Sequence, residues 1–269
     1  MRVLTVGDVV GEEAAYWVAG RLPVLRAELN LDVVIVNAEN SAVTGPSPMN
    51  GFGMTSDIVE VLLASGVDVI TGGNHSWDGP EVGEVLQHPS VVRPANLDTP
   101  LGRGVLTITG RDGLRISVVN LLSPSAALPD TNAPTPEPVW QAWLKVVAEH
   151  ELADVIVLDL HGESPWEKAA MATALDGTIS ALVGTHTHDA TFRGHILPGG
   201  TGYVTELGMT GRLGFTGGGF DPIHFATVLR GEPINDLPPF DLATGEMTLG
   251  AVLLEINSSG ATTAITRVH

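Results

Sequence analysis

The chain has 269 residues, with 13 Lys and Arg against 31 Asp and Glu, which gives a formal net charge of −18. A hydrophobic fraction of 43% supplies material for a sizeable core and excludes intrinsic disorder, while the lack of cysteine excludes disulfides, thiolate nucleophiles and Cys-based metal sites. Such an acidic chain is also a poor candidate for binding duplex nucleic acid, which needs a basic surface.

The first two thirds of the chain alternate short apolar runs with segments of helical spacing. Continuous runs rich in Val, Ile and Leu are typical of strands buried on both faces, and they occupy 2–7, 32–37, 67–71, 116–121, 154–158 and 180–183. Helices are predicted over 12–29, 56–64, 81–87, 138–150 and 166–175. We expect a bend in the first helix at Pro23, and we expect Ser164 to cap the last helix with Glu167 reaching back to it. This alternation indicates an α/β fold with a largely parallel sheet.

The last third of the chain follows another pattern. Strands without intervening helices are predicted over 200–204, 247–256 and 261–268, with 257–260 as a hairpin loop. Two long loops, 41–53 and 124–138, interrupt the pattern, but strands and helices continue on both sides of each. We therefore expect a mixed α/β sandwich with antiparallel pairing late in the chain, and a single domain over residues 1–269.

The N-terminal sequence Met-Arg-Val-Leu-Thr-Val-Gly-Asp contains no basic segment followed by a long apolar run, so we expect no signal peptide. No apolar stretch reaches the roughly 18 residues that a membrane-spanning helix needs. A cytoplasmic protein that does not enter a membrane is the resulting expectation. The apolar surplus leaves self-association into a homo-oligomer open.

Polar side chains follow five of the predicted strands at their carboxyl ends. They are Asp8, Glu39 with Asn40, Asn74 with His75, His161, and His186 with His188. The carboxyl ends of parallel strands meet at one edge of a sheet, where ligands bind. Oxygen and imidazole donors without sulfur suit Mn, Fe, Zn or Co better than Ca or Mg. So many candidate ligands exceed the needs of one tetrahedral ion and fit two ions that share a bridging carboxylate.

Each of these residues alone has an ordinary structural explanation. Asp8 could cap a turn, 37–40 could be a polar loop, and 72–75 could be a tight turn. His161 could be a hydrogen-bonded loop histidine. His186 and His188 are more specific, because histidines at i and i+2 lie on the same side of an extended segment. The recurrence of all five groups at one predicted edge favours a metal site.

Other features carry less information. His195 and His224 lie in loops rich in Gly and Pro, and a contact of either with substrate stays open. The sequence contains no Gly-x-Ser-x-Gly nucleophile elbow and no Walker-type phosphate loop.

The chain resembles the calcineurin-like metallophosphoesterases, and more narrowly their bacterial YmdB-like branch. The residues that carry the resemblance are Gly7-Asp8, Asn37-Ala-Glu39-Asn40, Gly73-Asn74-His75, His161 and Gly184-Thr-His186-Thr-His188. The segments Asn74-His-Ser-Trp-Asp78, Ile196-Leu-Pro-Gly-Gly-Thr201 and Leu207-Gly-Met-Thr-Gly211 are similar to the narrow branch. The resemblance covers nearly the whole chain.

The resemblance implies a four-layer α/β/β/α sandwich with mixed sheets and a centre of two divalent transition-metal ions, Fe or Mn first and Zn as an alternative. The implied ligands are Asp8 and His188, with Asn40 close by, for the first ion, Asn74, His161 and His186 for the second, and Glu39 as the bridge. His75 would protonate the leaving group. The implied substrate is a small phosphodiester, foremost a 2′,3′-cyclic nucleotide, attacked by a hydroxide that bridges the ions.

The sequence also departs from the wider superfamily. Val10 replaces a usual histidine, and Glu39 replaces a usual aspartate at the bridge. The stretches after Asn40 and His188 are expected to flank the substrate pocket, so they affect the substrate most. Two alternatives stay open: another dinuclear hydrolase, such as a phosphomonoesterase, amidase or peptidase, and a non-catalytic nucleotide-binding regulator.

Overall fold

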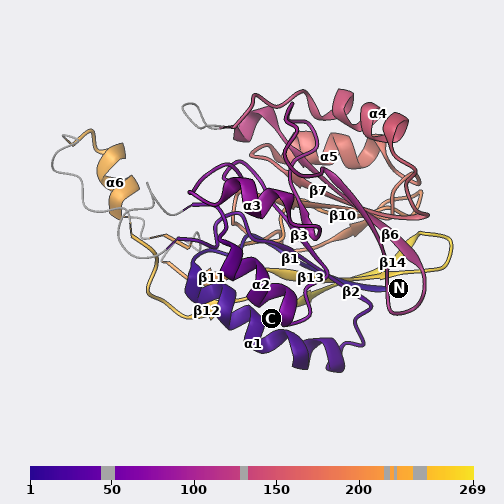
Figure 1. Ribbon diagram of the computed structural model, residues 1–269, viewed down its shortest axis with the longest axis horizontal. Coiled ribbons are helices and arrows are strands. Elements are labelled where there is room, and N and C mark those ends of the chain that lie inside the picture. Colours follow the sequence, from indigo (N-terminus) through magenta and orange to yellow (C-terminus); the bar gives the residue numbers. More distant parts are fainter. Residues whose placement is uncertain (44–51, 128–132, 215–218, 221–222, 233–240) are drawn as a thin grey trace.

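The computed structural model describes residues 1–43, 52–127, 133–214, 219–220, 223–232 and 241–269. Two six-stranded mixed sheets form its centre (Figure 1). The first sheet has the order β14 (Thr262–Val268), β13 (Ala251–Ile256), β1 (Arg2–Val6), β2 (Val33–Asn37), β3 (Val69–Thr71), β4 (Val91–Val92). The second has the order β5 (Val105–Thr109), β6 (Arg115–Leu122), β7 (Val155–His161), β8 (Ala181–Thr185), β10 (Gly202–Val204), β9 (His195–Ile196).

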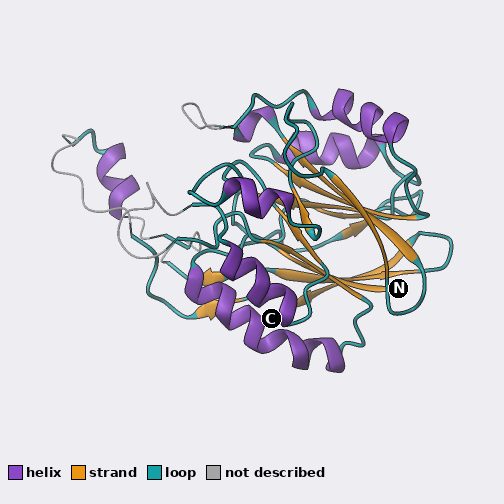
Figure 2. Ribbon diagram, viewed as in Figure 1, coloured by secondary structure: helices purple, strands orange, loops and turns teal. Residues whose placement is uncertain are grey.

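The helices are α1 (Glu12–Glu28), α2 (Ser56–Ala64), α3 (Val82–Gln87), α4 (Val139–Glu149), α5 (Pro165–Ala174) and α6 (Ile223–Leu229). Helices α1 to α5 lie on the outer faces of the two sheets, whereas α6 lies apart from them, as Figure 2 shows. Because α1, α2, α4 and α5 each connect neighbouring strands, β1 to β3 and β6 to β8 run parallel. The late strands β13 and β14 pair antiparallel, as the sequence predicts.

Three clusters of buried side chains separate four layers. Leu4 of β1 shares a cluster with Leu22 of α1, whereas its neighbour Val3 shares one with Val157 of β7. Successive residues of a strand point to opposite faces, so one face of the first sheet packs on helices and the other on the second sheet. The third cluster joins Leu158 to α4 and α5. This arrangement confirms the four-layer α/β/β/α sandwich.

The predicted cap of α5 and the predicted late hairpin are present, except for one contact of the cap. The Ser164 hydroxyl accepts a hydrogen bond from the Glu167 N–H at 3.3 Å, as predicted for the cap of α5. The Glu167 carboxylate, however, accepts a hydrogen bond from the Ser123 hydroxyl instead of reaching back to Ser164, so that half of the prediction is wrong. The predicted hairpin at 257–260 is confirmed, and the Asn257 Oδ1 accepts the N–H groups of Ser259 and Ala261 at 3.0 Å each.

The predicted strand over 247–256 is divided into β12 (Met247–Thr248) and β13. At the break, a Cβ on Gly250 would lie 2.3 Å from the Gly208 carbonyl oxygen, and the Gly250 N–H donates to the Thr210 hydroxyl at 3.0 Å. The strand β12 instead pairs with β11 (Gly211–Arg212). Helix α1 continues through Pro23 to Glu28.

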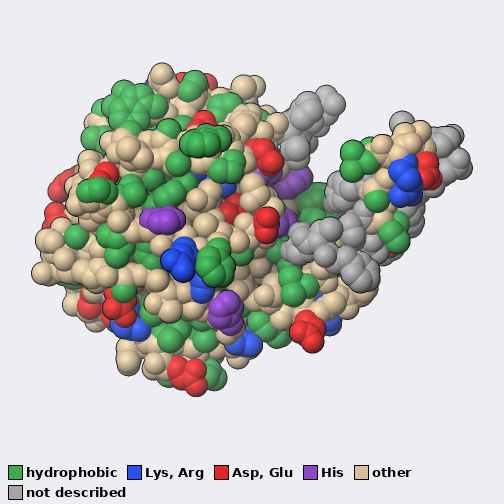
Figure 3. All heavy atoms as spheres, turned by 180° about the vertical axis from the view of Figure 1, so that it is seen from behind, with side chains coloured by type: hydrophobic (Ala, Val, Ile, Leu, Met, Phe, Trp, Pro, Cys, Tyr) green, Lys and Arg blue, Asp and Glu red, His purple; other side chains and the backbone are tan. Residues whose placement is uncertain are grey.

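The two long loops that the sequence predicts are described only in part. Residues 44–51 of the first and 128–132 of the second lie outside the described residues, and the second begins with a 3₁₀ turn over Pro124–Ala126. Figure 3 shows the molecule from behind, where Lys and Arg side chains are scattered rather than gathered. Among the described residues, no helix has both the length and the apolar character needed to cross a membrane.

Replacing Leu254 by Ala tests the packing between the sheets. Its side chain is fully buried in the central cluster, so we expect Leu254→Ala to lower the free energy of unfolding by about 2–5 kcal/mol. The matched control is Leu144→Ala on α4, where the leucine is 52% exposed and the expected change is under about 0.5 kcal/mol. Urea unfolding measures both, and equal losses would contradict the layer assignment.

Candidate metal centre

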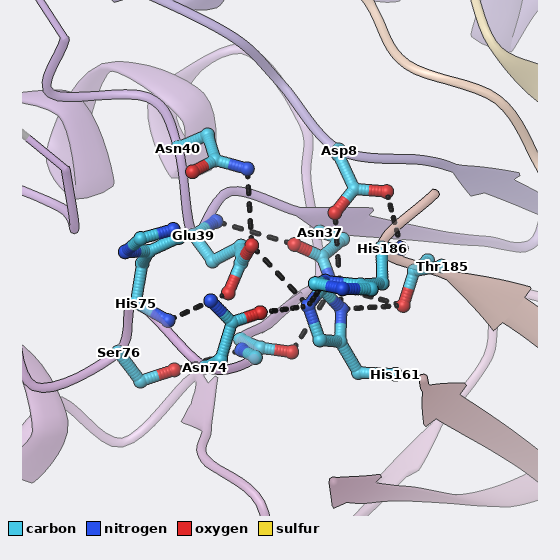
Figure 4. Close-up of polar contacts among 12 residues, drawn as sticks. Asp8, Asn37, Glu39, Asn40, Asn74, His75, Ser76, His161, Thr185 and His186 are labelled. Atoms are coloured by element: carbon cyan, nitrogen blue, oxygen red, sulfur yellow. Dashed lines mark hydrogen bonds and ion pairs between the residues drawn. The ribbon is translucent and has the colours of Figure 1, made fainter. Parts of the chain in front are cut away.

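The predicted polar residues converge at the edge where parallel strands of both sheets end. Asp8 follows β1, Glu39 and Asn40 follow β2, and Asn74 follows β3 in the first sheet; in the second, His161 ends β7 and His186 follows β8. Figure 4 shows their side chains facing one another across the space between the sheets. The edge predicted from the sequence is therefore present, but it is shared by two sheets that face each other.

The carboxylate of Glu39 is the meeting point of this group. Its Oε1 lies 3.3 Å from Nε2 of His161 and accepts a hydrogen bond from the Asn40 amide at 3.0 Å. Its Oε2 accepts the backbone N–H of His75 at 2.9 Å. The side chain is 1% exposed, so a charged carboxylate here depends on these neighbours rather than on water.

Atoms of the kind that bind metals surround Nε2 of His161. Nε2 of this residue is surrounded by Asn74 Oδ1 at 2.8 Å, His186 Nδ1 at 3.1 Å and Glu39 Oε1 at 3.3 Å. One ligand atom each from Glu39, His161 and His186 lies within 4.8 Å of the other two. Mixed imidazole, carboxylate and amide oxygen donors are a set that divalent transition metals accept.

Unpartnered buried atoms give an independent test of whether a cation fits. Oδ2 of Asp8 accepts the His186 N–H at 3.1 Å, whereas Oδ1 of Asp8 and Oδ1 of Asn40 are buried and accept no hydrogen bond from the described residues. Buried oxygens without partners are costly, and a cation beside them removes that cost. The Asn40 amide also lies 3.3 Å from Nε2 of His188, which brings the last predicted ligand to the same group.

Glycine at position 73 leaves room at the centre of the site. A Cβ there would lie 2.3 Å from Oε2 of Glu39 and 2.4 Å from Nε2 of His161. Any side chain at this position would occupy the space between the two groups. The residues present therefore fit a metal ion both in donor type and in available space.

The loop that carries the last two histidines has an unusual backbone. His186 has φ +103° and His188 has φ +64°, in the left-handed region that favours glycine. Such conformations persist only where surrounding contacts hold them, and they cluster at functional sites. The i, i+2 pair therefore does not form a simple extended segment, although both imidazoles reach the group.

Electrostatics couple the two sheets at this edge. Burial acts to lower the pKa of His161, but the carboxylates of Glu39, Asp8 and Asp159 outweigh burial and raise it to about 9. Burial acts to raise the pKa of Glu39, and the charge of His161 instead lowers it well below its usual range. Burial and the positive His161 ring together lower the pKa of His186 to about 3. At neutral pH and without an ion, a proton on His161 thus provides positive charge where a cation would otherwise lie.

His75 lies at the margin of this group. Its Nδ1 is 2.7 Å from Oδ2 of Asp78, and its ring stacks on Phe52 with centroids 4.0 Å apart and planes 12° apart. The Phe52 ring meets Phe220 at 5.9 Å, and Phe220 lies 6.1 Å from the ring of His188. A row of flat rings therefore borders the candidate metal centre.

Comparisons with known proteins agree with this geometry. Residues 4–268 match the family model described as YmdB-like protein. The chain belongs to the YmdB-like family. It is thereby a member of the YmdB-like branch of the metallophosphoesterases, the branch that its motifs resemble.

Individual relatives cover nearly all of the chain. A 2′,3′-cyclic-nucleotide 2′-phosphodiesterase of Bacillus subtilis is 35% identical over 260 residues, which are 96% of this chain and 92% of the relative. A crystal structure of a hypothetical protein from Thermus thermophilus has a TM-score of 0.82 and 34% identity, and covers 99% of this chain and 97% of its own. A structure of a novel phosphatase of Mycoplasma pneumoniae has a TM-score of 0.85 and 27% identity, with 100% and 92% covered.

The sequence analysis does not single out Asp159, which links the two sheets behind the candidate metal centre of this YmdB-like protein. Asp159 of β7 is buried and accepts hydrogen bonds from the hydroxyls of Thr71 at 2.6 Å and Thr185 at 2.7 Å. Burial raises its pKa. Thr185 in turn lies 2.8 Å from Nδ1 of His161, which fixes the orientation of that ring. A signal was available, because Asp159 is the one acidic residue inside a buried strand that is otherwise apolar up to the final His161.

The sequence left a substrate contact open for two further histidines. His195 is exposed in β9, the edge strand of the second sheet. The side chain of His224 lies outside the described residues. A contact that the sequence did not predict joins Nε2 of His186 to the carboxylate of Glu163, at 3.2 Å.

Gly73→Ala tests the central space directly. The added methyl group would collide with Glu39 and His161, so we expect bound metal to fall about tenfold or more while the fold is kept. The matched control is Gly20→Ala in α1, where a Cβ meets nothing within 4 Å. Elemental analysis of both purified variants measures the difference, and full metal content in Gly73→Ala would contradict the assignment of the site.

The pKa of His161 predicts a proton linkage. Because it is about 9 in the folded chain against 6.5 for the free side chain, the proton stabilises the metal-free fold below about pH 6.5, and this contribution is lost as the pH rises through 9. An ion bound by His161 must displace that proton. We expect Mn²⁺ affinity to rise about tenfold per pH unit between pH 6.5 and 8.5, with about one proton released per ion bound. Calorimetry in buffers of different ionisation enthalpy measures the release, and pH-independent binding would contradict this linkage.

Proposed function

We propose that this chain is a metal-dependent phosphodiesterase that hydrolyses a small phosphodiester, most of all a 2′,3′-cyclic nucleotide. The coarser class is established, because the chain is a phosphoric ester hydrolase by its membership of the family. The observation that carries the proposal is the convergence of the buried Glu39 and His161 with the half-buried His186, beside an oxygen of Asp8 that accepts no hydrogen bond from the described residues. The Bacillus subtilis relative supports the substrate.

We assign the ligands to two divalent ions, with Fe or Mn as the first choice. Asp8, Asn40 and His188 would hold one ion, Asn74, His161 and His186 the other, and Glu39 would bridge them. The 3.3 Å separation of the Asn40 amide from Nε2 of His188 supports the first group. The 2.8 Å and 3.1 Å approaches of Asn74 and His186 to His161 support the second.

When bound, the ions would supply an activated water and positive charge for the phosphoryl oxygens. Asp8 and Glu39 together contribute a charge of −2 against the +4 of two divalent ions. The site would therefore attract an anionic phosphodiester, although the whole chain carries −18. The protein's own role is to hold the ions between two sheets and to keep the nearby carboxylates out of bulk water.

His75 is the proposed general acid. Its Nδ1 lies on Asp78 at 2.7 Å, so Nε2 is left to face the substrate and to donate a proton to the leaving oxygen. Asp78 and the stacked Phe52 hold the ring in one orientation. The aromatic rings beside His75 and His188 favour a substrate that carries a flat base, because bases stack on such rings.

We also propose that residues 1–269 form one domain. The central cluster contains Val3 and Val252 of the first sheet with Val118 and Val183 of the second, so both sheets share one core.

Hydrolysis of 2′,3′-cyclic AMP and of bis-p-nitrophenyl phosphate under Mn²⁺ tests the activity, with a peptide and amide panel alongside. We expect Mn²⁺-dependent turnover of the phosphodiesters alone, and product analysis separates phosphodiesterase from phosphomonoesterase activity. Metal binding without turnover of any phosphate ester would contradict the proposal.

Two substitutions separate the proposed roles. His75→Ala should lower kcat about 10²–10⁴-fold and leave the metal content near that of the parent protein, because a general acid contributes that much and His75 is not a ligand. Glu39→Gln should reduce both, because a neutral side chain offsets less of the +4 charge. His195→Ala, on the exposed edge strand, is the control and should change neither. A fully active Glu39→Gln variant would rule out the bridging role.

A further inference from the structure

The second sheet contains a buried ion pair that the proposed chemistry does not use. Lys168 of α5 and Glu206, which follows β10, have side chains that are 1% and 3% exposed, and Nζ lies 3.0 Å from Oε2. Gly184 of β8 makes room for this lysine, because a Cβ at that position would lie 2.8 Å from Cδ of Lys168. The pair therefore lies directly behind the end of β8.

Both members of the pair form hydrogen bonds with the backbone next to His186. Nζ of Lys168 donates to the carbonyl oxygen of Thr185 at 2.8 Å. Oε2 of Glu206 accepts the N–H of Thr187 at 3.1 Å and its hydroxyl at 2.9 Å. The residue before His186 and the residue after it are thus both tied to one buried ion pair.

Further hydrogen bonds around Glu206 reach the backbone of His188 and the residues after it. The Met209 N–H donates to the carbonyl oxygen of His188 at 3.2 Å, and the Gly208 N–H donates to Oε1 of Glu206 at 3.3 Å. Arg267 of β14 donates to the carbonyl oxygens of Glu206 and Thr191 at 2.7 Å each. The segment 205–209 therefore holds the segment 186–191 along its length.

Stability alone does not account for a pair of this kind. Taking two charges out of water costs about as much as their attraction returns, and apolar replacement of both partners is often neutral or stabilising. The loop beside the pair, by contrast, holds both histidines at positive φ, a conformation that costs free energy and persists only where surrounding contacts offset that cost. Besides the hydrogen bond from the His186 N–H to Asp8, the contacts that hold the backbone on both sides of His186 are those made by Lys168 and Glu206.

We propose that Lys168 and Glu206 are positioning residues that hold the 186–188 loop in its left-handed conformation and so set the metal affinity of the centre. This inference rests on the proposed function, because it assumes that His186 and His188 bind metal. Neither residue is among the proposed ligands; both would act through Thr185 and Thr187.

The test is Mn²⁺ binding to the metal-stripped full chain, followed by the electron paramagnetic resonance signal of free Mn²⁺. In the double variant Lys168→Met/Glu206→Leu both charges are removed together, so no unpaired charge is left, but the backbone groups of Thr185 and Thr187 lose their partners. We expect its free energy of unfolding to fall no further than that of the control Arg26→Met, and its Mn²⁺ affinity to weaken about 10–100-fold. Glu206→Gln keeps an acceptor for Thr187 and should retain more affinity than Glu206→Leu.

A matched control corrects for any loss of stability. Arg26→Met breaks a pair with Asp68, in which the arginine side chain is 7% exposed and the two groups are 2.6 Å apart, at the opposite end of the first sheet's strands. It should lower stability and leave Mn²⁺ affinity unchanged. Parent-like affinity in the double variant, or an equal loss in Arg26→Met, would overturn the inference. No Mn²⁺ binding by the parent protein would instead overturn the proposed function.

Discussion

The burial of negative charge at the meeting edge of two sheets is the constraint on which this structure depends. Asp8 and Glu39 are 0% and 1% exposed, and Oδ1 of Asp8 has no hydrogen-bond partner among the described residues. Carboxylates removed from water are tolerated only beside positive charge or donors. In the metal-free chain the raised pKa of His161 supplies part of that charge. The two cations that we propose would supply the rest.

Behind the proposed ligands, buried polar groups join the layers so that the donor atoms keep their positions. Asp159 ties Thr71 of the first sheet to Thr185 of the second, and Thr185 orients His161. Lys168 and Glu206 hold the other side of Thr185 and the residue after His186. Fully satisfied networks of this kind fix one arrangement of the core, and they let a metal site be shared by two sheets that could otherwise shift relative to each other.

The parts of the fold that the sequence predicts well are those where burial on both faces leaves a run rich in Val, Ile and Leu, such as 32–37 and 154–158. The edge strand β5 was missed because its residues are half-exposed and its pairing with β6 is a tertiary choice. The set of candidate ligands was predictable because each residue directly follows a buried strand. The sharing of these ligands between two facing sheets was not predictable, because hydrophobic periodicity carries no information on how sheets pack. The positive φ values at His186 and His188 could not be predicted either. A positive φ ordinarily favours glycine, and contacts with residues distant in the sequence impose it on these histidines.

Anomalous diffraction at the manganese absorption edge, from crystals grown with Mn²⁺, tests the central claim most directly. The account predicts two peaks about 3.5–4 Å apart on either side of the Glu39 carboxylate, one within reach of Asp8 and His188 and the other within reach of His161 and His186. A single peak would contradict the shared, two-ion centre. Peaks only at other places on the molecule would contradict the claim that buried negative charge at this edge exists to bind metal.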